Sequence, residues 1–382
     1  MIYSKERFGS FFTEVEYSNF SADDSEVQEQ MFVIRPFVDK YADFKTQLER
    51  VNETFCQIMT KSNDFVPVFV RVFVSDATNQ EPSIKETFKL NCPLSIIEQP
   101  PLDGNKLTLW AYVQKGIQTE KLSNGLFKVS HNGYEHLWSS AIPTPQGDSK
   151  EQTRELLNNY VSQLSDQGCT LLADTIRTWF FVQNVDVNYA GVVVGRNEVF
   201  DQEGLTDDTH FISSTGIQGR KSDYHITSVM DAYSVKGLKR EQIQFLYAPT
   251  HLNNTAEYGV RFERGTAVHY GDRTHTFISG TASINNKGDV VYVGDIYNQT
   301  LRMIENVEKL LLEADCTMGN VAQIIIYLRD IADYKEVKKM FDNMLADIPK
   351  VFVLAPVCRP TWLIEMECIA IKANTHKKYA KY

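Results

Sequence analysis

The sequence predicts an α+β protein built from three copies of one unit, and two observations support this. Three stretches have the periodicity of amphipathic helices: KTQLERVNETFCQIM from Lys45, QTRELLNNYVSQLSDQGC from Gln152 and QTLRMIENVEKLLLEADC from Gln299. Each is followed by two runs rich in β-branched and aromatic residues, which predict strands. Because helix and strands recur at similar spacing, we expect an internal triplication.

Short sequence markers align the three copies. In each predicted helix a Thr is followed six residues later by an Asn: Thr46 and Asn52, Thr153 and Asn159, Thr300 and Asn306. The second and third copies also carry a Cys sixteen residues after that Thr, Cys169 and Cys316. From the Thr to the Lys that ends the last strand, the copies span 69, 83 and 72 residues. Any α+β protein alternates helices and strands, but these shared distances favour a repeat.

The predicted strands divide the chain into units. The first strand after each helix is VPVFVRVFVSD, TIRTWFFVQNVD or VAQIIIYLRDIADY, and the closing strand is LTLWAYVQKG, YHITSVMDAYSVKG or TWLIEMECIAIKA. Polar, turn-rich stretches between them predict a degenerate first unit at 30–120, a second at 121–240 and a third at 241–382. Residues 1–29 are expected to be an acidic, mobile extension, and the tail ANTHKKYAKY a solvated basic end.

Composition excludes several classes of function. The chain has 382 residues and a net charge of −10, which argues against nucleic acid as a partner, since phosphate binding needs a basic face. Its six cysteines form no CxxC pair and have no zinc-type spacing to histidine, so no metal site is expected. No apolar run is long enough to cross a membrane, and the first residues do not read as a signal peptide. We therefore expect a cytoplasmic protein with reduced thiols.

The third copy resembles the Rid (reactive-intermediate deaminase) family. The resemblance lies in FISGTAS, in the helix from Gln299 and in LIEMECIAIK, which contains a Glu-x-Glu motif. Free-standing Rid proteins are trimers whose sites lie between subunits. The resemblance therefore implies three Rid-like (chorismate-mutase-like) units of sheet and helix fused in one chain as a pseudo-trimer, which would be a monomer.

A second resemblance covers most of residues 130–373. The motifs TIRTWFFV, VVVGRNEVF, SSTGIQGR, YGVRFERGTAV, FISGTASI, VGDIYNQT and CRPTWLIEME together resemble the chorismatases. These Rid-fold enzymes split chorismate into pyruvate and a cyclohexadiene diol or a hydroxybenzoate. The chain departs from the family pattern at Phe180, Phe181 and residues 285–287, so the resemblance leaves the exact substrate and the product open.

Two carboxylates in the last strand are candidates for acid catalysis. Glu365 and Glu367 are spaced two apart, so both point to one face of the sheet. Cleaving a vinyl ether requires a proton donor, and burial in a strand raises a carboxyl pKa toward neutrality. The chorismatase resemblance selects Glu365. Seven residues before the closing Lys, the other copies have Val229 and Thr108, so only the third carries the acid. The alternative is that both glutamates are exposed and paired with Lys or Arg.

Chorismate carries two carboxylates, so binding requires cations, for which bidentate Arg is best suited. The candidate cations are Arg359, Arg261, Arg264, Arg220 and Arg177. Gly280, Thr281 and Ala282 would let backbone N–H groups approach a bound anion, since Gly has no Cβ. The resemblance also implies that Cys358 lines the pocket as in the hydroxybenzoate-forming subtype, although a buried inert thiol is the alternative. Tyr258 and Tyr224 are candidate hydroxyls, with core or rim positions as alternatives.

No cofactor is expected, because the chain lacks a P-loop, a dinucleotide-binding glycine motif and a nucleophile elbow. The expected partner is a small anionic, chorismate-like substrate. Two other functions stay open. One is a Rid-like deaminase of reactive imines, although its Pro-x-Arg segment reads IPKVFVLAP here, with Lys350. The other is a non-catalytic protein that binds small molecules.

Overall fold

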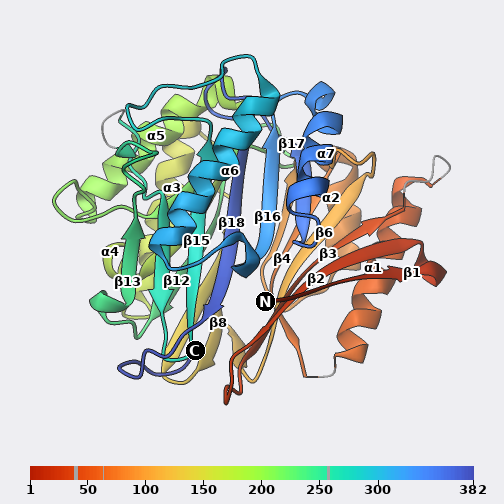
Figure 1. Ribbon diagram of the computed structural model, residues 1–382, viewed down its shortest axis with the longest axis horizontal. Helices are drawn as coiled ribbons and strands as arrows, with labels where there is room; N and C mark the ends of the chain where they lie inside the picture. Colours follow the sequence, from red (N-terminus) through yellow and green to blue (C-terminus); the bar gives the residue numbers. More distant parts are fainter. Residues whose placement is uncertain (38–41, 63, 256–258) are drawn as a thin grey trace.

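The structure is a computed structural model that describes residues 1–37, 42–62, 64–255 and 259–382. Within these ranges the strands form three six-stranded sheets, each from a continuous part of the chain (Figure 1). The chain passes from the first sheet to the second between Lys115 and Gln118, and from the second to the third between Lys236 and Ile243. The predicted α+β class, with three Rid-like units fused in one chain, is confirmed.

The three sheets have the following strands and helices. The first contains, in spatial order, β1 (Ile2–Phe8), β2 (Thr13–Ser21), β3 (Gln28–Pro36), β6 (Leu107–Lys115), β4 (Val66–Val74) and β5 (Leu94–Glu98), with helices α1 (Phe44–Lys61) and α2 (Ala77–Thr87). The second contains β7 (Gln118–Lys121), β8 (Phe127–His131), β9 (Tyr134–Ala141), β12 (Ser228–Lys236), β10 (Thr175–Val182) and β11 (Ser213–Gln218), with α3 (Ser149–Ser165), α4 (Leu171–Asp174) and α5 (Val185–Gln202). The third contains β13 (Ile243–Leu246), β14 (Gly265–His269), β15 (Arg273–Ala282), β18 (Ile364–Ala373), β16 (Val321–Leu328) and β17 (Lys350–Leu354), with α6 (Ile296–Glu313) and α7 (Tyr334–Met344).

The three units share the same topology, including one irregularity in strand pairing. In each, the edge pair β4–β5, β10–β11 or β16–β17 is parallel and is connected through α2, α5 or α7. The pairing of each closing strand with its neighbour shifts register at a corresponding place, between Pro67 and Phe69, Thr175 and Arg177, or Val321 and Gln323. A bulge that recurs at one position in all three units supports a common origin for them.

In each unit, a glutamine at the start of the long helix makes the same hydrogen bond. The side-chain oxygens of Gln47, Gln152 and Gln299 accept hydrogen bonds, at 2.9, 2.8 and 2.9 Å, from backbone N–H groups just before the closing strands. Thr153 and Thr300 follow this Gln by one residue, whereas Thr46 precedes it. The predicted Thr/Asn marker is therefore wrong for the first copy, where it is offset by two residues.

The expectation of a mobile extension at residues 1–29 is wrong. Strands β1 and β2 form the edge of the first sheet, in antiparallel register with each other and with β3. The acidic residues that suggested a solvated segment pair instead with cations of neighbouring strands: Lys5 with Glu14 at 2.7 Å and Arg35 with Glu16 at 3.0 Å.

The tail is largely the solvated basic end that its composition suggested, with Lys377, Lys378 and Lys381 exposed, but its last residue is not. Tyr382 is buried, and its hydroxyl accepts a hydrogen bond from the Gln114 side chain at 2.5 Å. The same buried cluster holds Glu29, which is paired with Arg273 at 2.6 Å and with His275 at 2.9 Å. Polar side chains from the first and third sheets and the last residue of the chain thus meet in one interior cluster.

No helix in the described ranges combines the length and apolar character needed to cross a membrane. The same residues contain no group of three His, Cys, Asp or Glu side chains that could hold a metal ion.

Candidate active site

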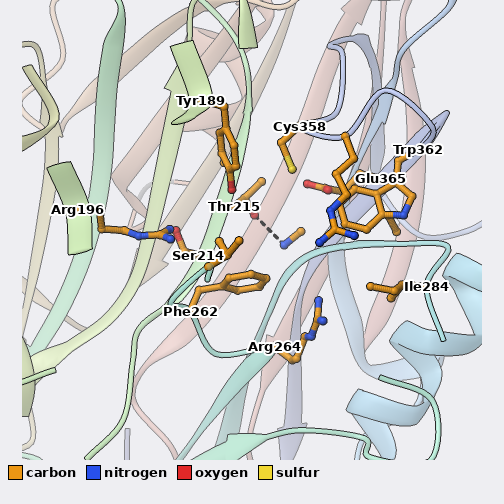
Figure 2. A pocket seen from close by; sticks show the side chains of 15 residues that line it. Tyr189, Arg196, Ser214, Thr215, Phe262, Arg264, Ile284, Cys358, Trp362 and Glu365 are labelled. Carbon is orange, nitrogen blue, oxygen red and sulfur yellow. Dashed lines mark hydrogen bonds between the residues drawn. The ribbon is translucent and has the colours of Figure 1, made fainter. Parts of the chain in front are cut away.

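A cavity of about 220 Å³ lies where the second and third sheets meet. Figure 2 shows Tyr189 and Arg196, from α5, on the side opposite Glu365 and Trp362. The lining residues are Tyr189, Arg196, Ser214, Thr215, Gly216, Val260, Phe262, Arg264, Gly280, Ala282, Ile284, Cys358, Arg359, Trp362 and Glu365. Both units contribute, so the site exists only where two units meet.

Glu365 lies on β18, opposite Ala282 of β15, and is only 4% exposed. A Cβ at Gly280 would lie 2.2 Å from its Oε1, so the carboxyl group rests against a backbone that only glycine leaves open. Burial and then the nearby Glu367 carboxylate raise the pKa of Glu365 to about 8, while Arg177 and Arg264 act in the opposite direction. Glu365 therefore holds its proton at neutral pH and can deliver it.

Glu367, two residues further along β18, accepts hydrogen bonds from three buried donors. Arg177 Nη2 lies 2.7 Å from its Oε2, Trp179 Nε1 lies 2.8 Å from its Oε1, and the Thr215 hydroxyl makes a short contact with Oε2. Thr215 Oγ1 also accepts the N–H of Gly280 at 2.9 Å (Figure 2). This network joins the second unit to the strand that carries Glu365, and it places a second carboxylate behind the first.

Three arginines line the cavity. Arg264 is buried, and its Nη2 donates to the side-chain oxygen of Asn253 at 3.1 Å. The Arg359 guanidinium lies over the Trp362 ring, 4.7 Å from its centroid. Arg196, on α5, is 3% exposed. Three guanidinium groups around one neutral carboxylic acid suit an anionic ligand that takes up a proton.

Cys358 and Tyr189 meet at the same cavity. The Tyr189 hydroxyl acts to lower the pKa of the Cys358 thiol, but burial outweighs it. Burial and the charge of Glu365 raise the pKa of Cys358 to about 12, so the sulfur stays a neutral thiol. Gly216 makes room for Tyr189, because a Cβ there would lie 2.8 Å from the Tyr189 ring.

Comparison with known proteins identifies the third unit. The family model for Endoribonuclease L-PSP matches residues 265–372. A RutC family protein of Pyrococcus abyssi is 32% identical over 98 residues, which are 25% of this chain and 77% of that protein. The chain belongs to the RutC family. The 3-aminoacrylate deaminase RutC of Acinetobacter baylyi is 28% identical over 96 residues, which are 25% of this chain and 76% of that protein.

Beyond the RutC-type unit, the likeness to a solved structure extends over most of the chain. A crystal structure of chorismatase superposes with a TM-score of 0.62 at 16% identity, covering 80% of this chain and 93% of that one. At this identity the match concerns the fold. The expected Rid-like and chorismatase-like architecture is therefore confirmed.

In this RutC family chain, six of the predicted site residues line the cavity: Glu365, Arg359, Arg264, Gly280, Ala282 and Cys358. Thr281, between two of them, points elsewhere and donates to the backbone oxygen of Ser279 at 2.9 Å. Arg177 lies one layer behind Glu365, where it pairs with Glu367. Its expected role as a contact for substrate is not supported by this position.

Three other predicted residues, Arg261, Arg220 and Tyr224, do not line the cavity. Arg261 is paired with Asp201, although its neighbours Val260 and Phe262 line the cavity. Arg220 pairs with Glu98 of the first unit at 2.7 Å. Tyr224 is 60% exposed and packs its ring against the Arg220 guanidinium. Tyr258 lies outside the described residues.

Sequence reasoning overlooked several lining residues of this RutC family chain. Arg196 lies within VVVGRNEVF, and Ser214, Thr215 and Gly216 lie within SSTGIQGR, two motifs of the chorismatase resemblance. These motifs therefore contained the signal, but nothing in the sequence says that α5 and β18 line the same cavity. Trp362 in CRPTWLIEME was overlooked in the same way.

Proposed function

We propose that this protein is a chorismatase-type enzyme that cleaves the enolpyruvyl ether of chorismate with Glu365 as general acid. The products would be pyruvate and a hydroxybenzoate or a dihydroxycyclohexadiene carboxylate. The observation that carries the proposal is the Glu365 carboxyl group itself. It is buried, its pKa is raised to about 8, and it faces a cavity lined by three arginines.

The proposed reaction begins with proton transfer from Glu365 to the methylene carbon of the enolpyruvyl group. The resulting oxocarbenium carbon is attacked by water, and collapse of the hemiketal releases pyruvate and the diol. In the other route the bond between the ring carbon and the ether oxygen breaks, and this oxygen leaves as part of pyruvate. The ring then loses a proton and becomes a hydroxybenzoate, with no net addition of water. In both routes the acid is needed at the first step, where a positioned donor contributes about 10²–10⁴-fold.

The cations of the cavity support a substrate with two carboxylates. Arg196 on α5 and Arg264 before β14 come from different units, so they can hold two separate anionic groups. Arg359 lies six residues before Glu365 in the chain and lines the same cavity. Bidentate arginines would fix the ring relative to the acid, which is how orientation lowers the barrier.

The test is a pyruvate-release assay on chorismate with the full chain. We expect pyruvate and one equivalent of an aromatic acid or a diol, and chromatography of the second product decides between the two routes. No pyruvate above a heat-inactivated control would contradict the proposal.

The second candidate is a deaminase of reactive imines, which the named activity of the Acinetobacter baylyi relative favours. Against it, Lys350, which stands where Rid proteins carry their carboxylate-binding Arg, lines a different cavity from Glu365. Ammonia release from freshly generated 2-aminoacrylate, measured beside the pyruvate assay, separates the two activities.

The pH dependence of pyruvate release follows from the state of Glu365. Because the protonated carboxyl is the active form and its pKa is raised to about 8, we expect a turnover number that is level below pH 8 and falls above it. A pH–rate profile at saturating chorismate measures this. A rate that rises through pH 8 would mean that Glu365 acts as a base.

Gly280→Ala is expected to lower pyruvate release by about 100-fold, because the added Cβ would lie 2.2 Å from Glu365 Oε1 and displace the acid. The clash is with the end of a side chain, so the fold should persist. Gly9→Ala is the matched control, since a Cβ at Gly9 meets nothing within 4 Å. Wild-type activity in Gly280→Ala would show that the position of the carboxyl group is not critical.

A further inference from the structure

A chain of buried ion pairs leads from the first unit to the carboxylate behind the Glu365 cavity. Arg71, on β4 of the first unit, donates to Asp231 of the second: its Nη2 and Nε lie 2.7 and 3.2 Å from Oδ2. Arg71 Nη1 lies 4.0 Å from Oε1 of Glu367 in the third unit, which Arg177 of the second unit also binds. The first unit therefore contributes a charge here, although none of its described residues lines the Glu365 cavity.

The two ion pairs are equivalent features of successive units. Asp231 and Glu367 each stand five residues before the Lys that ends the closing strand, whereas the first unit has Trp110 at this place. Each carboxylate binds an arginine of the preceding unit, Arg71 on β4 or Arg177 on β10. The same kind of pair thus joins the first unit to the second and the second to the third, and Arg71 lies close enough to Glu367 to couple the two.

Arg71 is enclosed by aromatic rings and held by one close carboxylate. Its guanidinium carbon lies 5.2 Å from the centroid of the Trp179 ring and 4.9 Å from that of Phe181. Asp231, which binds it, also accepts a hydrogen bond from the Ser95 hydroxyl of β5 at 2.7 Å. Because Arg71 and Asp231 are both nearly inaccessible to water, solvent screens their charges little.

The charges of this buried cluster are balanced while Glu365 is protonated. Two arginines, Arg71 and Arg177, face two carboxylates, Asp231 and Glu367, so ionisation of Glu365 would add a third carboxylate. The other titratable neighbours of these five groups come from the elements packed around them: Arg264, Tyr189, Cys358, Cys368, Tyr327 and Lys221. Of these, Lys221 is itself paired with Glu81 at 2.8 Å.

We propose that Asp231 is a positioning residue for the acid, an inference that rests on the proposed function of Glu365. By holding the Arg71 guanidinium, Asp231 keeps a second cation from Glu367 and so preserves the negative potential that retains the proton on Glu365. Asp231 lines no part of the cavity and acts only through these charges. The first unit, which carries no acid of its own, then takes part in the reaction through Arg71 and Ser95.

The pH–rate profile of pyruvate release by Asp231→Asn tests this role. The variant loses one negative charge, while the asparagine oxygen can still accept from Arg71, so the cluster becomes more positive and Glu365 ionises more readily. We expect the pH above which turnover falls to move from about 8 in the wild type to about 7. An unchanged profile would overturn the proposal.

Arg71→Met distinguishes an effect of charge from an effect of packing. It removes the cation and keeps Asp231, so the fall in turnover should stay at about pH 8 or move higher. If the pairs served only to hold the units together, both variants would admit water to the acid and move the fall to lower pH. If Asp231→Asn does not fold, Arg71→Met decides alone, and a fall at lower pH than in the wild type would overturn the proposal.

Asp272→Asn is the matched control. Asp272 is also a buried carboxylate that binds a buried arginine, Arg273, at 2.8 Å. It precedes Ala282, the register partner of Glu365, by ten residues, which is about 30 Å along β15. Its loss should leave the profile unchanged, and a shift equal to that of Asp231→Asn would overturn the proposal.

A second measurement does not depend on chorismate. The free energy of unfolding of each variant is compared, from pH 4 to pH 10, with that of the same variant carrying Glu365→Gln. The difference is the stability that the Glu365 proton contributes, which is lost as pH rises to about 8 in the wild type and to about 7 in Asp231→Asn. If no chain releases pyruvate, the proposed function fails, and this comparison still decides whether Asp231 acts on Glu365. Equal curves for wild type and Asp231→Asn would show that it does not.

Discussion

Glu365→Gln is expected to reduce pyruvate release from chorismate by about 10²–10⁴-fold. The amide has the size of the carboxylic acid and can stay in the same place beside Gly280, but it has no proton that it can transfer at neutral pH. Because the binding arginines are intact, the loss should fall on the turnover number while the KM changes little. Steady-state kinetics of the purified variant measure both quantities.

The stability of the same variant distinguishes a lost acid from a damaged fold. The folded-state pKa of Glu365, about 8, lies above its ordinary value of 4.5, so the folded protein binds this proton more tightly than the unfolded chain. The stability that this group contributes is complete below pH 4.5 and is lost as pH rises to about 8. Glutamine does not ionise, so Glu365→Gln should be at least as stable as the wild type at pH 7 and more stable at pH 9.

Glu135→Gln is a suitable control for this experiment. Glu135 is also a strand glutamate, but its side chain is 32% exposed and pairs with Lys236 at 3.3 Å. It should leave activity unchanged and alter the melting temperature little at either pH. Wild-type turnover in Glu365→Gln would mean that another group supplies the proton.

The architecture was predictable because the repeated pattern is local. Apolar spacing marks each long helix, and short runs rich in β-branched residues, such as VAQIIIYL, favour buried strands. The alignment of the copies was less secure, because the residue that recurs for a structural reason is the Gln at 47, 152 and 299. Its hydrogen bonds reach residues 59 to 75 positions away, and no sequence spacing reveals them.

The site was predictable in part, and the errors have one cause. Arg177 and Arg264 look alike in sequence, yet one is neutralised by Glu367, 190 residues further along the chain, and the other lines the cavity. Arg196 was overlooked because its helix reaches the cavity only through the packing of the second unit on the third. Which arginine faces a ligand depends on contacts between units, and these are not encoded in local patterns.

Because Arg177 is buried, we expect its replacement to cause a large loss of stability. Its side chain is 2% exposed and that of Glu367 is 5% exposed, so removing the cation leaves a carboxylate in the interior without its closest countercharge. Such a loss typically costs about 3–5 kcal/mol. Trp179 and Thr215 still donate to Glu367, and Arg71 lies 4.0 Å away, so we expect Arg177→Met to lower the free energy of unfolding by about 3 kcal/mol.

Chemical denaturation of three variants tests this explanation. Arg261→Met removes an ion pair whose Asp201 side chain is 58% exposed, and it should cost less than about 1 kcal/mol. In the double variant Arg177→Met/Glu367→Gln no unpaired charge is left, so stability should be partly restored relative to Arg177→Met alone. If Arg177→Met costs no more than Arg261→Met, Glu367 does not carry a buried charge. The carboxylate that contributes to the raised pKa of Glu365 would then be absent, so the same measurement also tests the electrostatic origin of the proposed acid.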